Sequence, residues 1–199
     1  GMLDTHVGWL ANQGMNYLAT GENPKRIGNQ HPNILPYQVM PTSDGYIVLS
    51  VGNDPTFERF CKLAECEELL EDERFQTNAA RVSNRDHVTE TLNEITKKKT
   101  SEWWLDNLEK EKIGSGPINN LEQVFADPHV IAREMVIEMD HPATGSKPMK
   151  LIANPIKLSA TPPTYRKPPP LLGEHTDEVL QEAGLSADEI AKLKEDGTV

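Results

Sequence analysis

The side chains best suited to chemistry in this sequence are its two cysteines and six histidines. Catalysis by a cysteine nucleophile needs an adjacent base, but neither Cys61 nor Cys66 has a histidine near it, and both fall on one apolar helical pattern. The histidines show none of the H-x-H, H-E-x-x-H or Cys/His spacings that bind metals. No G-x-S-x-G elbow or glycine-rich phosphate loop occurs. These patterns predict neither a catalytic residue nor a metal site.

Composition and charge limit the class of partner. The chain has 199 residues, enough for one domain or two small ones. Its net charge of -11 opposes binding to nucleic acid. It also opposes binding of polyanionic CoA unless cations gather in one place, as they do at Lys97–Lys99. This run is more typical of the end of a helix, where cations face the negative dipole terminus. No apolar run approaches the roughly 20 residues that span a bilayer, and no signal peptide is recognised, so we expect a cytoplasmic protein with reduced thiols.

Hydrophobic periodicity predicts the elements that open the chain. An apolar stripe at helical spacing predicts one helix from Leu3 to Leu18, with Gly21 as its C-cap. Residues 23–40 have little periodicity and read as a loop. Residues 46–51 form an almost continuous apolar run, which predicts a strand buried on both faces.

Capping residues predict the helices that follow. Asp54 before Pro55 is expected to be the N-cap of the first of these helices. Asp86 or Asn84 is expected to open another helix, and Ser101 is expected to cap a third. Gly114–Pro117 lacks a preceding strand and reads as a turn.

The last third of the chain changes character, because many of its 15 prolines gather there. Two short helices, around 121–125 and from Asp127, precede paired strands at 135–139 and 151–152. Residues 154–170 read as an extended linker. Two helices close the chain, the first capped by Thr176 and the second by a capping box of Ser186 and Glu189.

Three stretches of the sequence carry a resemblance to a known family. The C-terminal run PPPLLGEHT (168–176), with RIGNQHPN (26–33) and Pro36-Tyr37 further back, resembles the family III CoA-transferases. This family includes formyl-CoA:oxalate and succinyl-CoA:dicarboxylate transferases and the related acyl-CoA racemases. The resemblance runs from about Leu3 to Val199 but covers only the second half of the family pattern. The chain therefore reads as the C-terminal portion of such an enzyme.

The resemblance implies an α/β fold class, with a small α+β domain and a returning C-terminal segment. It maps residues 1–27 to a linker helix region and residues 28–118 to most of the small domain. Residues 119–199 map to the return segment, with its proline-rich linker and two final helices. The family pattern also implies a homo-oligomer, an interlocked dimer in which two subunits thread through each other.

The chemistry that the resemblance implies uses a carboxylate nucleophile. An aspartate attacks the acyl-CoA thioester, forms an enzyme-bound anhydride and releases the CoA thiolate. The acceptor acid then replaces the donor acid, which leaves as a free carboxylate, and the thiolate attacks the second anhydride that results. The family places this aspartate and the CoA-binding residues in its first half. Asp4 is assigned a helix-capping role, so no catalytic residue is assigned in this chain. We expect the chain alone to be inactive, with acyl-CoA and a small carboxylic acid as substrates of the complete enzyme and no further cofactor.

The loop 28–38 holds the candidate substrate-binding residues. The matching stretch in oxalate-type transferases is a glycine-rich flap over the thioester, but this chain has no glycine run. The resemblance implies that His31, Asn33 and Tyr37 bind the acyl carboxylate, in the manner of transferases that act on larger dicarboxylic acids. Alternatively, the prolines only route the chain into the small domain, with Tyr37 packed against it.

Two other functions stay open at this point. The chain could be a stand-alone, non-catalytic binding module from a truncated gene. It could also be a fragment of an acyl-CoA racemase, in which paired acid and base groups move a proton beside the thioester. Racemases usually carry a Gly-Ala-Pro-Phe-like stretch where this chain has residues 33–36, which favours the transferase.

Overall fold

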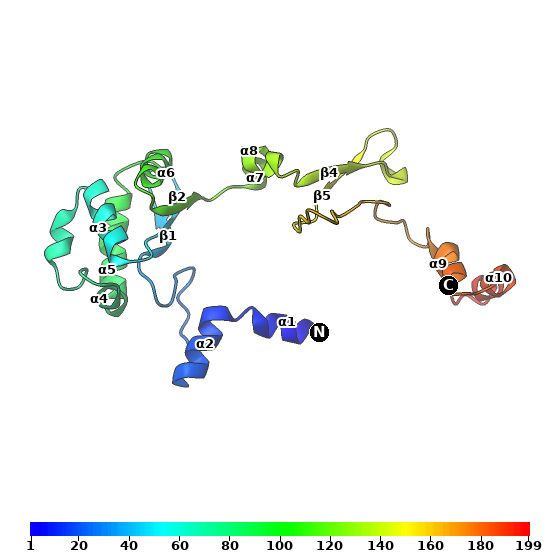
Figure 1. Cartoon of the computed structure of the whole chain (residues 1–199), viewed down its shortest axis with the longest axis horizontal. Coiled ribbons are helices and arrows are strands. Elements are labelled where there is room, and N and C mark those ends of the chain that lie inside the picture. Colours follow the sequence, from blue (N-terminus) through cyan, green and yellow to red (C-terminus); the bar gives the residue numbers. More distant parts are fainter. The chain divides into compact units, whose positions relative to one another are not determined.

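A computed structural model describes all 199 residues and divides the chain into two compact units, Gly1–Ile118 and Asn119–Val199 (Figure 1). The first unit combines helices with a small antiparallel sheet, and the second holds short helices and a two-stranded sheet. This mixed helical and antiparallel architecture confirms the expected fold class. None of the helices is long and apolar enough to cross a membrane.

The first unit begins with two helices, α1 (Met2–Gly8) and α2 (Ala11–Thr20). The single helix predicted here was wrong, because Ala11 has a positive φ of 41°, a conformation that interrupts the helical hydrogen-bond ladder. Gly21 ends α2 in the left-handed conformation, as predicted. Asp4 lies in the first turn of α1 but makes no capping hydrogen bond, so its expected capping role is not seen.

The sheet of the first unit runs in the order β1 (Tyr37–Pro41), β2 (Tyr46–Ser50), β3 (Gly114–Pro117), all antiparallel. Burial alternates along β2, so the prediction of two buried faces was wrong. All of β1 except Pro41 lies in the stretch 23–40 that was expected to be a loop, and β3 replaces an expected turn. A side chain at position 114 would come within 3.2 Å of the Ser50 carbonyl oxygen, so glycine allows this edge strand to pair closely.

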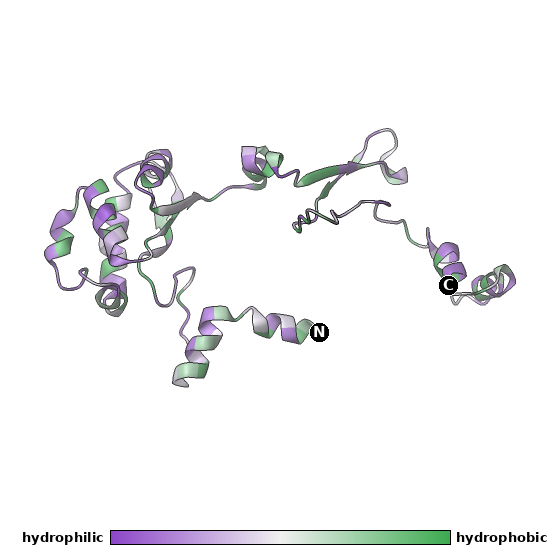
Figure 2. Cartoon of the chain, viewed as in Figure 1, coloured by the Kyte–Doolittle hydropathy of each residue, from purple (hydrophilic) through white to green (hydrophobic).

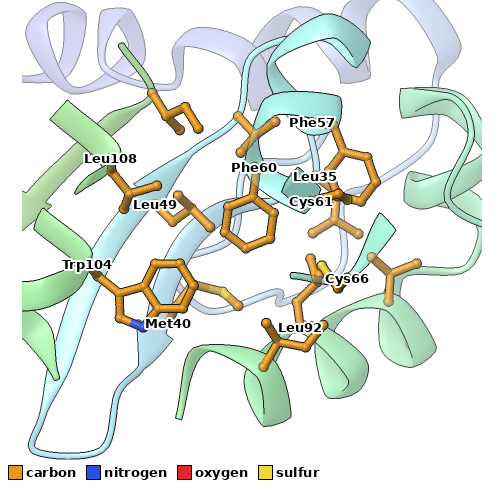
Figure 3. Close-up of a cluster of buried hydrophobic side chains, with 14 of the residues drawn as sticks. Leu35, Met40, Leu49, Phe57, Phe60, Cys61, Cys66, Leu92, Trp104 and Leu108 are labelled. Atoms are coloured by element: carbon orange, nitrogen blue, oxygen red, sulfur yellow. The ribbon is translucent and has the colours of Figure 1, made fainter. Parts of the chain in front are cut away.

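Helices pack against the inner face of the sheet and enclose one hydrophobic core (Figure 3). The elements that follow β2 are α3 (Asp54–Leu63), η1 (Glu67–Glu71), α4 (Asn78–Ser83), α5 (Arg85–Thr96) and α6 (Ser101–Lys110). Ile47 and Leu49 of β2 are fully buried beside Phe60 and Trp104. The indole N–H of Trp104 donates to the Thr96 carbonyl at 2.7 Å, which satisfies the polar atom of this buried ring.

Both cysteines belong to this core. Cys61 lies on α3, whereas Cys66 follows the end of that helix and is the N-cap of η1. Hydrogen bonding with Cys66, together with burial, raises the pKa of the Cys61 thiol above its usual range. A protonated, enclosed thiol is a poor nucleophile.

Two of the predicted N-caps lie one residue away from their expected positions. Asn53 caps α3 by accepting from the backbone N–H of Thr56 at 2.9 Å, and Thr100 caps α6. Asp54 and Ser101 were therefore wrong as caps, because their side chains bind other elements of the fold. The Ser101 hydroxyl donates to Asp44 Oδ1 at 2.9 Å, and the Asp54 carboxylate accepts from Arg81 of α4, as described below.

The second unit contains α7 (Leu121–Ala126), α8 (Pro128–Ala132), β4 (Val136–Met139), η2 (Pro142–Thr144), β5 (Met149–Ile152), α9 (Thr176–Glu182) and α10 (Ala187–Glu195). β4 and β5 pair antiparallel, which confirms the predicted strands. The capping box of Ser186 and Glu189 is confirmed at α10. Thr176 was wrong as the cap of α9, whose N-cap is His175.

Hydrophobic side chains are also exposed in both units. Figure 2 marks hydrophobic positions along α1 and α2, and neither helix has a buried residue. In the second unit an apolar groove of ≈ 500 Å³ lies between α8 and the β4–β5 pair. Its lining includes Val130, Ile131, Met135 and Leu151.

Candidate substrate-binding site

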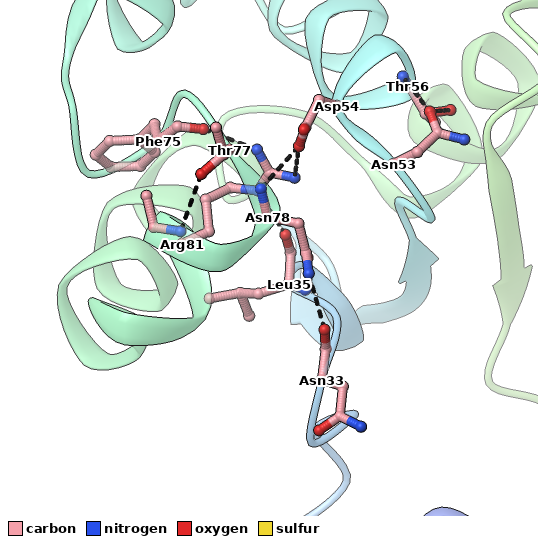
Figure 4. A network of polar contacts seen from close by, with 10 residues as sticks. Asn33, Leu35, Asn53, Asp54, Thr56, Phe75, Thr77, Asn78 and Arg81 are labelled. Carbon is pink, nitrogen blue, oxygen red and sulfur yellow. Dashed lines mark hydrogen bonds and ion pairs between the residues drawn. The ribbon is translucent and has the colours of Figure 1, made fainter.

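Asn78 of α4 holds the backbone of the loop 28–38 (Figure 4). Its side-chain N–H donates to the Asn33 carbonyl at 2.8 Å, and its Oδ1 accepts from the Leu35 N–H at 3.1 Å. One amide therefore pairs with both a carbonyl and an N–H of the loop, in the way that a neighbouring strand would. The Asn33 backbone is fixed while its side chain points away from this contact.

Arg81, one turn further along α4, is the fully buried centre of the same network (Figure 4). Its Nε donates to the Leu35 carbonyl at 2.7 Å, and its Nη1 donates to the Phe75 carbonyl at 2.7 Å. Its Nη2 pairs with Asp54 Oδ1 at 2.8 Å, and the guanidinium lies 4.2 Å from the ring centre of Phe57. Burial lowers the pKa of Arg81, and the Asp54 carboxylate opposes this shift. The buried charge is thus fully paired, as a buried cation must be.

Arg85, the first residue of α5, holds the start of the loop. Its Nη2 donates to the Pro32 carbonyl at 2.8 Å, and its Nη1 donates to Gln30 Oε1 at 3.2 Å. Asn29 adds a further restraint by accepting from the Val39 N–H at 2.9 Å. Side chains far away in the sequence therefore fix the loop backbone at several points, which pre-organises the residues it presents.

The structure brings the three predicted binding residues together. The rings of His31 and Tyr37 stack with centroids 5.3 Å apart and planes 8° from parallel. The backbone N–H of His31 donates to the Tyr37 carbonyl at 2.9 Å, and the backbone N–H of Asn33 donates to the ring nitrogen Nδ1 of His31 at 3.1 Å. Tyr37 is 39% exposed, so its ring is not buried in the domain.

Two asparagines of α2 complete this cluster. Asn16 and Asn33 exchange a pair of amide hydrogen bonds at 3.1 and 3.2 Å. The side-chain amide of Asn12 lies 3.0 Å from His31 Nε2.

A polar groove of ≈ 450 Å³ opens between α2, the segment after it and this loop. Its charged lining residues are Glu22, Lys25 and Arg85. Uncharged polar groups complete it, among them Gln13, Asn16, Thr20, Asn23 and Asn33. The groove is lined by hydrogen-bonding groups, which suit contact with a polar ligand. No three His, Cys, Asp or Glu side chains come together as metal ligands.

Sequence reasoning missed Asn78, Arg81 and Arg85, which hold the loop in place. Their spacing of three and then four residues places them on one side of a helical pattern. This spacing of two arginines and an asparagine was the signal in the sequence that could have identified them. It was not decisive, because such a stripe is equally typical of a solvated helix face.

Comparisons with known proteins agree on one family. The model of "CoA-transferase family III" matches residues 1–176. The succinate–glutarate CoA-transferase of Agrobacterium fabrum is 41% identical over 181 residues, which cover 91% of this chain and 45% of that enzyme. The human succinyl-CoA:glutarate CoA-transferase is 36% identical over 181 residues, covering 91% of this chain and 41% of the relative.

A solved structure is similar as well. A CAIB/BAIF family protein from Brucella suis superposes with a TM-score of 0.68 at 43% identity, covering 88% of this chain and 44% of that one. The chain spans less than half the length of each of these relatives.

Proposed function

This chain belongs to CoA-transferase family III, and from that membership we propose that it supplies the acyl-recognition part of a CoA-transferase. The complete enzyme would move CoA between a thioester and a dicarboxylic acid through an aspartyl anhydride. The nucleophilic aspartate would lie outside these 199 residues. The names of the relatives support this proposal, because they pair succinate or succinyl-CoA with glutarate.

The pre-organised loop is the observation that carries the proposal. Its backbone is held by Asn78, Arg81 and Arg85, while the side chains of His31, Asn33 and Tyr37 form one polar and aromatic cluster. A rigid loop loses little conformational freedom when it binds a ligand, so it can orient an acyl group at low entropic cost. None of these groups is an activated nucleophile, which fits binding better than catalysis.

The proposed partners follow from the same function. Acyl-CoA and a small carboxylic acid are the substrates, with the CoA thioester consumed as substrate and no separate cofactor. We propose a homo-oligomer in the cytoplasm. Exposed apolar residues on α1 and α2, such as Leu3 at 74% and Leu18 at 76%, support self-association.

A chimera with a relative tests the proposal. The part of the Agrobacterium fabrum enzyme that this chain does not match is fused to this chain, and transfer of CoA from succinyl-CoA to glutarate is measured. We expect turnover by the chimera but none by this chain alone or by the unmatched part alone. A folded chimera without turnover would contradict the proposal. Turnover by this chain alone would show that the nucleophile lies within it.

A further inference from the structure

Arg85 is a cation of the groove without a carboxylate partner. It forms no ion pair, in contrast to Arg81, whose charge is matched by Asp54 at 2.8 Å. A guanidinium has five N–H donors, and Arg85 uses one on Gln30 and one on Pro32. Three donors remain, and one of them, on Nε, has no partner in the fold and is not fully buried.

The Arg85 side chain is also partly removed from solvent. Desolvation is the main influence on the Arg85 guanidinium and lowers its pKa, while the neighbouring Asp86 only partly opposes the shift. A half-buried charge of this kind interacts more strongly with an anion than a fully solvated lysine does. The guanidinium fork also matches the two oxygens of a carboxylate.

The surroundings of Arg85 also suit an anion. Lys25 is the second cation of the groove and forms no ion pair, and Glu22 is the one acidic side chain in the lining. The charged lining therefore sums to one positive charge, although the whole chain carries -11. The volume of ≈ 450 Å³ lies in the range of small-molecule sites, about 300–1,000 Å³.

Arg85 also adjoins the predicted acyl-binding residues. It donates to the Pro32 carbonyl at 2.8 Å, and Asn33, the next residue, lines the same groove. A ligand that contacts Asn33 at one end therefore has a guanidinium within the same groove. We propose that Arg85 binds the distal, non-reacting carboxylate of a dicarboxylic acyl group and so selects dicarboxylic over monocarboxylic substrates. This inference rests on the proposed function.

A comparison of two matched acceptors tests the inference in the active chimera. Glutarate and its monoamide have nearly the same shape, but only glutarate has a distal negative charge. We expect the chimera with native Arg85 to prefer glutarate in kcat/KM by roughly ten- to a hundredfold, because a hydrogen bond to a charged group is lost with the monoamide. Arg85→Gln should reduce this ratio to near one, while Arg85→Lys should retain part of it.

Control variants separate recognition from a loss of structure. Arg59→Gln removes an arginine of the same unit that lies outside the groove lining, and it should leave the acceptor ratio unchanged. Thermal unfolding of each variant reports whether the fold survives. Equal losses for both acceptors in a folded Arg85→Gln variant would overturn the inference. If Arg85→Gln does not fold, an unchanged ratio in Arg85→Lys would overturn it instead.

A binding experiment on this chain keeps the inference distinct from the proposed function. Glutarate and its monoamide are titrated into the isotope-labelled chain, and the amide signals of Lys25, Asn33 and Arg85 are followed by NMR. Larger shifts with glutarate that vanish in Arg85→Gln would support the site even if the chimera were inactive. An active chimera whose Arg85 variants show the native acceptor ratio would overturn the inference and leave the proposed function standing.

Discussion

His31 Nδ1 accepts the backbone N–H of Asn33 at 3.1 Å and so closes a tight turn around Pro32. The second unit contains the same arrangement, in which His141 Nδ1 accepts the N–H of Ala143 at 3.0 Å across Pro142. In each case the imidazole accepts the backbone N–H two residues later, as the side-chain oxygen of asparagine or aspartate does in an Asx turn. Histidine in this position is first a structural residue, and any contact with a ligand must come from its exposed face.

This turn separates the expected effects of two substitutions in the loop. Asn33→Ala removes only the amide pair with Asn16 and should change stability little, since Asn33 is exposed. In the chimera, kcat/KM for several dicarboxylic acids should change unequally, by roughly ten- to a hundredfold for the most affected acid. His31→Ala should shift acceptor preference as well, but with a lower melting temperature because the turn is lost.

An equal decrease in kcat/KM for every acceptor acid would show that Asn33 has only a structural role. Asn16→Ala is the matched control, because it breaks the same amide pair from the other side. An acceptor profile that shifts in Asn33→Ala but not in Asn16→Ala would locate the effect in a contact between Asn33 and the substrate.

Removal of the Arg81 side chain should destabilise the first unit severely. Arg81→Met leaves the carbonyls of Leu35 and Phe75 without their donor, and each unsatisfied buried group costs about 1–3 kcal/mol. We expect the free energy of unfolding to fall by about 2–5 kcal/mol in urea titrations. Arg74→Met, which breaks an exposed ion pair with Asp72, should have a much smaller effect. Equal losses for the two variants would contradict the assigned role of Arg81.

The Asp44–Ser101 contact should make stability depend on pH in acid. The Ser101 backbone N–H and then its hydroxyl hold the pKa of Asp44 below its ordinary value of 3.8. A carboxyl whose pKa is lower in the folded state stabilises the fold above its unfolded pKa, and this stabilisation is lost as pH falls through the folded pKa. The Asp44→Asn variant should therefore be less stable than the native chain at pH 7. Its stability should fall by a smaller amount than that of the native chain when the pH is lowered.

Urea midpoints at pH 7 and at about pH 3, below the ordinary aspartate pKa, measure this difference. Asp106→Asn is the control, since Asp106 lies on the exposed face of α6 and accepts no hydrogen bond. The same pH dependence in Asp44→Asn as in the native chain would show that the contact is not coupled to folding.

The sequence predicted the helices and strands that local signals define, and failed where distant residues decide. The Ser186–Glu189 capping box and the Gly21 C-cap are local, and both were predicted. β3 has no strand propensity of its own and forms because β2 offers it an edge. The loop 28–38 follows the same rule, because the arginines that hold it lie about 50 residues later in the sequence.

The exposed apolar surface of α1 and α2 leads to a prediction about assembly. Leu3, Val7 and Leu10 are 74%, 56% and 56% exposed, and neither helix buries any residue. Burying one such side chain contributes about 1.5–3 kcal/mol, so a few of them are enough to drive association. We expect sedimentation velocity to show dimers or larger species at micromolar concentrations.

Introducing negative charge on the same surface should prevent this association. Val7→Glu with Leu10→Glu places two carboxylates among the apolar residues, where burial of an unpaired charge is strongly unfavourable. Because both positions are exposed in the structure, the folded unit should keep its melting temperature while the sedimentation coefficient falls to that of a monomer. Glu182→Gln, a neutral change on the exposed surface of α9, should leave the assembly as it is. A native chain that sediments as a monomer at high concentration would mean that the apolar faces of α1 and α2 pack on their own chain in solution.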